Sequence, residues 1–303
     1  MTVGGFSATI PGMGKTIIGL LRETVASHPD SVYMKERRPE GWVGATFQEV
    51  AEEARCVAGF LLSRGLRKGD RVALLAEGRN SWVCAELGIL LAGAISVPVS
   101  IKIRERGEVL LRVKHSESRF AITSERHLAK VTGLLDDLPL LEGILLLDEV
   151  PAELTRRCPS VPVWPWLDVL ATGKAFAEAN PQVLSTIEQA IQEDDPATLT
   201  YTSGTSAEPK GILLSHRNYW TNASDGDAVY PLPAPLYMLL ILPWDHSFAH
   251  TAGLFIFLKK ASVIAAVEPG VNELGTIRNT PRNMKEIGPT YLLVVPALVE
   301  SFR

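Results

Sequence analysis

The chain has 303 residues, of which 46% are hydrophobic and 21% charged, and its formal net charge is −4. This length allows two domains of about 150 residues or one large α/β domain, and the apolar content excludes intrinsic disorder. Because 30 Lys and Arg residues stand against 34 Asp and Glu residues, the composition argues against a nucleic-acid partner.

The first clear element in the chain is a helix over residues 46–62. Thr46 and Glu49 match a capping box, apolar residues follow at helical spacing, and Gly65 is expected at the end. The next expected elements are a strand at 71–75, a helix that Asn80 or Ser81 caps and that runs to Leu91, and a strand at 94–99.

Beyond residue 100, short apolar runs alternate with helical stretches. This alternation predicts βαβ units and a mostly parallel sheet. The expected strands are 120–123, 144–147, 198–202, 211–215, 236–242, 262–266 and 291–295. The expected helices are 104–114, 216–223, 248–258 and 271–287.

The stretch 151–196 has the weakest pattern. We interpret it as a surface excursion that joins two αβ regions, about 15–150 and 197–303, within one unit over 1–303. It is not expected to be a flexible linker, because Trp164, Trp166 and Leu167 favour burial.

The cysteines and the apolar runs bear on the compartment. Cys56, Cys84 and Cys158 are widely spaced and form no CxxC pair, which argues against a disulfide framework and a cysteine zinc site. The N-terminus does not match a secretory signal, and the apolar run 87–99 is too short to cross a bilayer. We therefore expect a cytoplasmic protein whose contact with membranes is at most peripheral.

The segment 200–218, TYTSGTSAEPKGILLSHRN, has the pattern of a phosphate site. Consecutive N–H groups in a turn of small residues form an anion-binding concavity, and Lys210 adds a point charge. Such a loop would bind a triphosphate and stabilise a departing pyrophosphate. The expected binding residues are Thr202, Ser203, Gly204, Thr205, Ser206, Ala207 and Lys210. Composition alone fits an ordinary polar hairpin loop equally well, and a Walker A loop is excluded because Lys210 follows Pro209.

The order of residues 202–211, TSGTSAEPKG, resembles the phosphate loop T-S-G-T-T-G-x-P-K-G of the adenylate-forming (AMP-binding) superfamily. Residues 215–218, SHRN, resemble that family's S-H-x-N, and 242–246, LPWDH, resemble its L-P-x-x-H. Ser206 and Ala207 depart from the usual Thr and Gly. Serine keeps the hydroxyl, whereas a Cβ at position 207 costs about 1 kcal/mol if that residue requires a positive φ.

The resemblance implies a large α/β N-terminal domain of the adenylate-forming type, with layered, mostly parallel sheets flanked by helices. It implies that the adenine- and ribose-binding segments and a mobile C-terminal domain with a catalytic lysine lie beyond position 303. The implied activity is that of an acyl-CoA synthetase, most like a bacterial long-chain fatty-acid–CoA ligase, which forms an acyl-adenylate. The implied ligands are a fatty acid, ATP, Mg²⁺ and coenzyme A, and residues 1–303 alone are expected to be inactive.

The resemblance also places His246 beside the acyl carboxylate and the adenylate, as a catalytic and substrate-binding residue, with Trp244 and Phe248 lining an acyl channel. An ordinary structural interpretation puts Trp244 in the core and His246 at a helix cap. His246 and His250 have the spacing of zinc-protease ligands, but Ser247 stands where the HExxH motif needs Glu. No metal site is expected.

Two other functions stay open. One is an adenylation module that activates an amino or aryl acid and loads a carrier protein. The other is a non-catalytic nucleotide-binding remnant, because the adenine and lysine elements do not occur in these residues.

Overall fold

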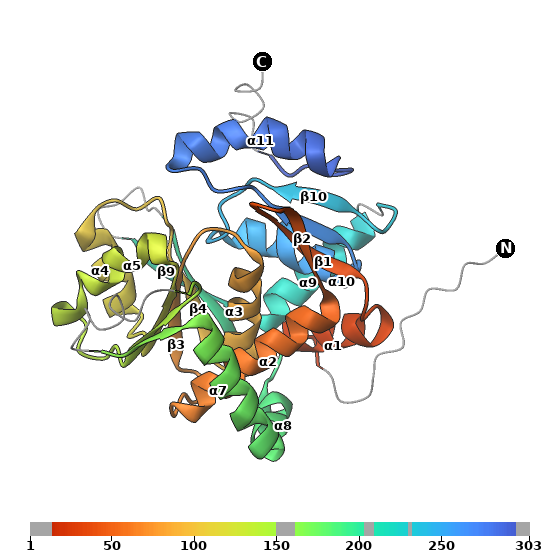
Figure 1. Ribbon diagram of the computed structural model, residues 1–303. Coiled ribbons are helices and arrows are strands. Elements are labelled where there is room, and N and C mark those ends of the chain that lie inside the picture. The colour runs from red at the N-terminus through yellow and green to blue at the C-terminus, as the bar shows by residue number, and fades with distance from the viewer. Residues whose placement is uncertain (1–13, 150–160, 203–208, 230–231, 295–303) are drawn as a thin grey trace.

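The computed structural model (Figure 1) describes residues 14–149, 161–202, 209–229 and 232–294. Its strands form a four-stranded sheet, ordered β10-β11-β1-β2, and a seven-stranded sheet, ordered β7-β6-β5-β3-β4-β8-β9. Neighbouring strands run parallel except in the β1–β2 and β8–β9 pairs, which confirms the predicted fold class. The strands are β1 (Val32–Arg38), β2 (Gly41–Thr46), β3 (Arg71–Leu75), β4 (Ile95–Pro98), β5 (Phe120–Thr123), β6 (Gly143–Leu146), β7 (Val163–Pro165), β8 (Pro196–Thr202), β9 (Lys210–Ser215), β10 (Tyr237–Leu240) and β11 (Val263–Ala266).

Helices connect these strands and cover the sheets. They are α1 (Ile17–Ser27), α2 (Phe47–Ser63), α3 (Asn80–Leu91), α4 (Arg106–His115), α5 (Glu125–Thr132), the 3₁₀ helix η1 (Leu135–Asp137), α7 (Trp166–Ala179), α8 (Pro181–Ala190), α9 (His216–Val229), the π-helix η2 (Ala249–Phe255), α10 (Ile256–Lys259) and α11 (Glu273–Ile287). In the described part of the chain, no helix is both long and apolar enough to cross a membrane.

Strand β3 lies inside the seven-stranded sheet and is buried on both faces. Val72 and Leu74 belong to one core cluster with α2 and α3, whereas Ala73 and Leu75 belong to a second cluster with α4 and α5. Since side chains alternate between the two faces of a strand, one short apolar run fills both cores. Figure 1 shows α4 and α5 on one side of this sheet and α3 on the other.

The capping residues predicted for the first two helices are confirmed in α2 and wrong in α3. Thr46 Oγ1 accepts from Glu49 N at 3.1 Å while Thr46 N donates to Glu49 Oε2 at 2.7 Å, which confirms the capping box of α2. Gly65 follows that helix with φ of +79°. The predicted cap of α3 was wrong. Arg79 occupies that position without a side-chain cap, because the N–H of Asn80 donates to the Glu36 carboxylate from β1 at 2.7 Å.

The described part of the 151–196 stretch is packed against the rest of the protein. Strand β7 pairs with β6, and α7 packs so closely on α2 that a Cβ on Gly173 would overlap the Cys56 carbonyl. Trp166 is buried, and its Nε1 donates to Glu53 at 2.7 Å. Leu167 is 61% exposed, so its predicted burial was wrong. Adjacent residues of a helix point in different directions, so Trp166 faces α2 whereas Leu167 faces solvent.

Several elements were missing from the predicted order. The order predicted from the sequence lacks α1 and α5, although Thr16 caps α1 and both helices have one apolar face. It also lacks the hairpin β1–β2, in which β1 carries charged residues and β2 has no buried residue. Strand β1 nevertheless pairs with β11 from the far end of the chain. The predicted strand at 291–295 is reduced to a bridge between Tyr291 and Met238 in the described residues.

Candidate functional site

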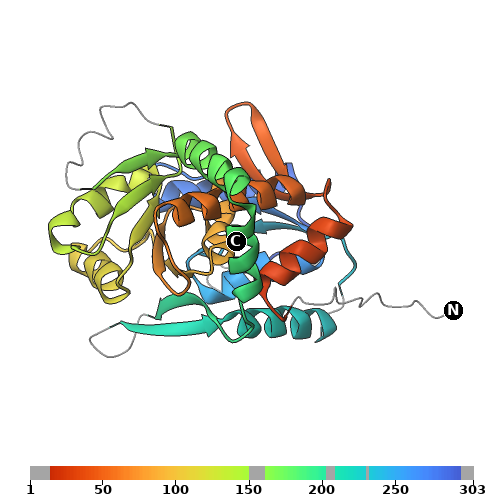
Figure 2. The ribbon, with the colours of Figure 1, turned by 90° about the horizontal axis from the view of Figure 1, so that it is seen from below.

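The predicted phosphate loop is framed by an antiparallel hairpin. Thr202, the last residue of β8, is the register partner of Lys210, the first residue of β9, and both side chains are exposed. Figure 2 shows this hairpin at one side of the molecule, followed by α9. Ser203, Gly204, Thr205, Ser206 and Ala207 lie outside the described residues. The two strands predicted to flank this loop are thus present, β8 before it and β9 after it.

The loop end of the hairpin has a close contact at Gly211, the register partner of Tyr201. A Cβ at this position would lie 2.9 Å from Leu199 Cδ1 and 3.3 Å from the Tyr201 ring. The Tyr201 hydroxyl donates to the Arg112 carbonyl at 3.2 Å and lies 2.8 Å from His115 Nδ1. Burial raises the pKa of Tyr201 to about 12. These contacts tie the strand that leads into the loop to helix α4.

The SHRN segment begins a helix. The N–H of Ser215 donates to Asn218 Oδ1 at 2.9 Å, and the N–H of Asn218 donates to Ser215 Oγ at 3.2 Å. His216 is buried, and its Nδ1 accepts from the N–H of Ile17 at 3.4 Å. Burial lowers the pKa of His216 to about 4, although Asp195 opposes that shift. In the described residues, this motif therefore joins β9, α9 and α1.

The LPWDHSF segment follows β10 and leads into η2. His246 is exposed, and its Nδ1 accepts from the N–H of Phe248 at 3.2 Å, so the imidazole caps the start of the helix. Trp244 is buried and lies edge-on to Trp82 of α3, with ring centroids 5.5 Å apart. Phe248 is 49% exposed. Within the described residues, the hydrogen bond and ring contact of this segment are made with its own backbone and with α3. The roles of the three residues toward a substrate stay predictions.

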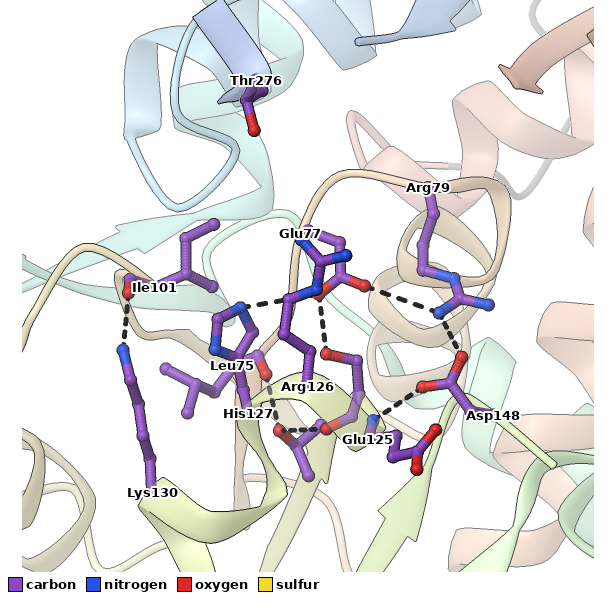
Figure 3. A network of polar contacts seen from close by, with 12 residues as sticks. Leu75, Glu77, Arg79, Ile101, Glu125, Arg126, His127, Lys130, Asp148 and Thr276 are labelled. Atoms are coloured by element: carbon purple, nitrogen blue, oxygen red, sulfur yellow. Dashed lines mark hydrogen bonds and ion pairs between the residues drawn. The ribbon is translucent and has the colours of Figure 1, made fainter. Parts of the chain in front are cut away.

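A cluster of charged residues lies at the carboxyl ends of β3, β5 and β6, where open α/β sheets bind ligands. Figure 3 shows that Glu77, Arg79, His127 and Asp148 converge there. Arg79 pairs with Asp148 at 2.6 Å and with Glu77 at 3.7 Å. Glu77 also accepts from Ser124 Oγ at 2.6 Å and lies 3.6 Å from His127 Nε2. Burial lowers the pKa of His127, and the Glu77 carboxylate opposes this effect.

Next to this cluster, a cavity of about 210 Å³ lies where the carboxyl ends of strands from both sheets meet. Its lining combines the ends of β1 and β11 with the loop after β3, and includes Glu36, Arg38, Glu77 and Arg79. Such a charged lining suits a polar group better than an acyl tail. The sequence signal that points here is the pair of charged residues in Glu77-Gly78-Arg79, two residues after a buried strand ends.

Sequence reasoning also missed a fully buried polar pair behind the LPWDHSF segment. Glu86, in the middle of the apolar helix α3, faces His250 of η2, with 3.4 Å between Glu86 Oε1 and His250 Nε2. A charged residue inside an otherwise apolar helix is the signal that could have found it. Over the described residues, no group of three or more His, Cys, Asp or Glu side chains is arranged to hold a metal ion.

Comparison with known proteins adds curated relatives of similar sequence. A long-chain-fatty-acid–CoA ligase of Xenopus laevis is 25% identical over 95% of this chain and 38% of its own length. A chloroplastic long-chain-fatty-acid–[acyl-carrier-protein] ligase of Arabidopsis thaliana is 25% identical over 95% of this chain and 39% of its own length. The chain therefore spans about two fifths of the length of these relatives.

The fold is shared with solved structures. The adenylation domain of a carboxylate reductase from Mycobacterium chelonae superposes with a TM-score of 0.77 at 20% identity, covering 96% of this chain and 47% of that one. The family of AMP-binding enzymes matches residues 21–303. The phosphate-loop sequence, the hairpin that frames it and this match together show that the chain belongs to the AMP-binding, adenylate-forming enzyme family.

Proposed function

We propose that the full-length protein activates a long-chain fatty acid with ATP, through an acyl-adenylate, and passes the acyl group to coenzyme A. The observation that carries this proposal is the β8–β9 hairpin, which sets Thr202 opposite Lys210 at the two ends of the Ser-Gly-Thr-Ser-Ala-Glu-Pro loop. The names of the curated relatives support the fatty-acid class, since both activate long-chain fatty acids.

In the proposed first step, a carboxylate oxygen of the acid forms a bond to the α-phosphorus as the bond to pyrophosphate breaks. Negative charge develops on the departing pyrophosphate, so donors close to it lower the barrier most. We assign this role to the loop N–H groups and hydroxyls of residues 202–207 and to the ammonium group of Lys210. Lys210 is exposed at the start of β9 and is therefore free to meet an incoming triphosphate.

We assign the carboxylate side of the site to the segment after β10. His246 is exposed there, and its ring is already oriented by the hydrogen bond from Phe248 N. We assign Phe248, which is half exposed, and Trp244, which is buried against Trp82, to the wall of the acyl channel. In this assignment, His246 meets the carboxylate of the fatty acid, and the aromatic side chains meet its apolar tail.

Mg²⁺ enters this proposal as part of the substrate MgATP. No metal-binding cluster is present among the residues that the structure covers, and magnesium is commonly held by one or two carboxylates together with substrate phosphates. The metal would neutralise charge on the β- and γ-phosphates, while the loop supplies hydrogen bonds.

A second candidate differs only in the acceptor. The Arabidopsis relative is named for transfer to an acyl carrier protein, so the acyl group could pass to a carrier thiol in place of coenzyme A. Both acceptors present a phosphopantetheine thiol, and the first half-reaction is the same for both.

The test is ATP–pyrophosphate exchange on the purified full-length protein. The acids should include palmitate, a medium-chain acid, an aryl acid and an amino acid, each followed by addition of either coenzyme A or acyl carrier protein. We expect exchange with palmitate and acyl-CoA formation. Exchange with only the aryl or amino acid would replace the fatty-acid assignment, and acyl transfer to the carrier protein alone would favour the second candidate.

A further inference from the structure

We propose that the buried pair Glu86–His250 is a positioning element for the adenylation site. The pair would hold the 244–250 segment in place against α3 and so set the orientation of His246 toward the acid. This inference rests on the proposed function, because it takes His246 as the group at the acyl carboxylate.

The pair is a buried polar contact inside an apolar core. Glu86 and His250 are both 0% exposed. Ser96 Oγ donates to Glu86 Oε2 in a short hydrogen bond, while Glu86 Oε1 faces His250 Nε2 at 3.4 Å. A buried carboxylate without a positive partner is strongly unfavourable. The burial of each group is therefore offset by its contact with the other, and loss of one partner leaves the other without that contact.

Three aromatic rings surround the imidazole. Trp82, Tyr219 and Phe255 have ring centroids 5.5, 5.9 and 6.0 Å from that of His250. No hydrogen bond to either ring nitrogen is present among the described residues, so the Glu86 carboxylate is the polar group that the ring faces. The three aromatic rings restrict the plane of the imidazole, and the Glu86 carboxylate determines which edge of the imidazole faces α3.

Two contacts on one face of α3 hold the 244–250 segment. Trp82 packs on both Trp244 and His250, and Glu86 lies one helical turn further along. The N–H of His250 donates to the His246 carbonyl at 3.2 Å. A shift of the His250 ring would therefore move the first turn of η2 and His246 with it. That first turn begins a π-helix, a form often found at functional sites.

The same network reaches the strand that leads into the phosphate loop. Ser96 of β4 is the register partner of Thr198 of β8, and Thr198 Oγ1 lies 2.8 Å from the hydroxyl of Tyr219. Tyr219 in turn packs against His250. The network thus connects the 244–250 segment with β8, whose last residue is Thr202 at the edge of the loop.

The proposal predicts a specific kinetic effect. If the pair fixes His246, its loss displaces the acid carboxylate from the α-phosphorus, whereas the loop at the end of β8 still binds MgATP. A displacement of this kind lowers kcat, and misplacement by about 1 Å can cost on the order of 100-fold. The KM for the acid should rise while the KM for MgATP stays nearly constant.

The experiment compares three variants of the full-length protein in ATP–pyrophosphate exchange and thermal unfolding. Glu86→Gln replaces one carboxyl oxygen by an amide group and keeps the shape of the side chain. The double variant Glu86→Met/His250→Leu replaces the pair by apolar groups of similar volume, which often restores stability after a buried pair is removed. Ile144→Ala is the control, because it makes a cavity in the second core cluster, away from this network.

We expect Glu86→Gln to lower kcat about tenfold or more and to raise the KM for palmitate, with the KM for MgATP changing less than about twofold. The double variant should melt near the wild-type temperature and still exchange slowly, whereas Ile144→Ala should lose stability and keep its kinetic constants at a temperature where it is folded. Recovery of wild-type kinetics in the double variant would overturn the proposal, as would equal kinetic losses in Ile144→Ala. If Glu86→Gln does not fold, the double variant alone decides between these outcomes. Absence of acid-dependent exchange in the wild-type protein would instead contradict the proposed function.

Discussion

The indole of Trp244 lies directly on the backbone of Gly78, so closely that a Cβ at position 78 would overlap the ring. Gly78 belongs to the charged loop after β3, and Trp244 to the segment after β10. The contact therefore joins the carboxyl ends of strands from the two sheets, beside the cavity of about 210 Å³. Glycine is required there for the close approach of an aromatic ring.

Gly78→Ala should therefore force Trp244 out of its place. Inserting a methyl group into a closely packed contact typically costs about 1–3 kcal/mol, which should lower the melting temperature of the full-length protein. Gly107→Ala is the matched control, since a Cβ at that helical position meets open space. Equal melting temperatures for the two variants would contradict the packing described for Trp244.

Replacing Trp244 or His246 by alanine should affect stability and adenylation differently. Trp244→Ala removes a buried ring, so we expect a loss of about 3–5 kcal/mol of stability and a changed preference for acyl-chain length. His246→Ala removes an exposed side chain, so it should slow adenylation for every chain length with little change in melting temperature. Pyrophosphate exchange over a series of fatty acids measures both effects. If both variants keep the wild-type rate and chain-length profile, these residues have only structural roles.

Lys210 should matter for catalysis and hardly for folding. Its side chain is exposed, and a charge-assisted contact to phosphate is worth roughly 1.5–3 kcal/mol. Lys210→Ala should reduce kcat/KM for MgATP by about 10- to 150-fold, with the melting temperature unchanged. Lys285→Ala, at the exposed end of α11, controls for the loss of one positive charge. Unchanged exchange kinetics in Lys210→Ala would exclude the loop as the phosphate site.

His216 should make the protein less stable in mild acid. Burial lowers its pKa to about 4 in the folded state, whereas an unfolded histidine titrates near 6.5. The unfolded state therefore takes up the proton first, so this contribution is complete above about pH 6.5 and is lost as the pH falls toward 4. The slope from one such group approaches about 1.4 kcal/mol per pH unit.

Urea unfolding of the full-length protein between pH 7 and 5 measures this slope, in a range where most carboxylates do not titrate. His216→Gln should flatten the curve, whereas His28→Gln, at an exposed position, should leave it as in the wild type. A steep curve that survives in His216→Gln would assign the acid sensitivity to another group.

Local signals in the sequence predicted part of the fold accurately. The capping box at Thr46 and Glu49 and the apolar run of β3 act over a few residues, and both were confirmed. Strands β1 and β2 could not be predicted in the same way. Their polar contacts are made with distant elements: Arg37 of β1 pairs with Glu286 at 3.3 Å, and Trp42 Nε1 of β2 donates to Glu286 at 2.8 Å.

In the candidate site, too, features within one segment could be predicted from the sequence, whereas contacts between distant segments could not. The residue order at 202–211 predicted a phosphate loop and indicated the family, because the motif is contiguous in sequence, and the family is confirmed. The Glu86–His250 pair and the cavity at the sheet edges depend on residues far apart in the chain. A charged residue after a strand or inside an apolar helix marks each position, but the partner that it meets is set only when the distant elements pack.

The most direct test of the proposed activity is detection of the acyl-adenylate itself. Purified full-length protein would be incubated with palmitate and MgATP without an acceptor, and the products would be identified by mass spectrometry. We predict palmitoyl-AMP and pyrophosphate in equal amounts, and conversion to palmitoyl-CoA when coenzyme A is added. Release of ADP and phosphate, or the absence of an adenylate with every carboxylic acid supplied, would contradict the account.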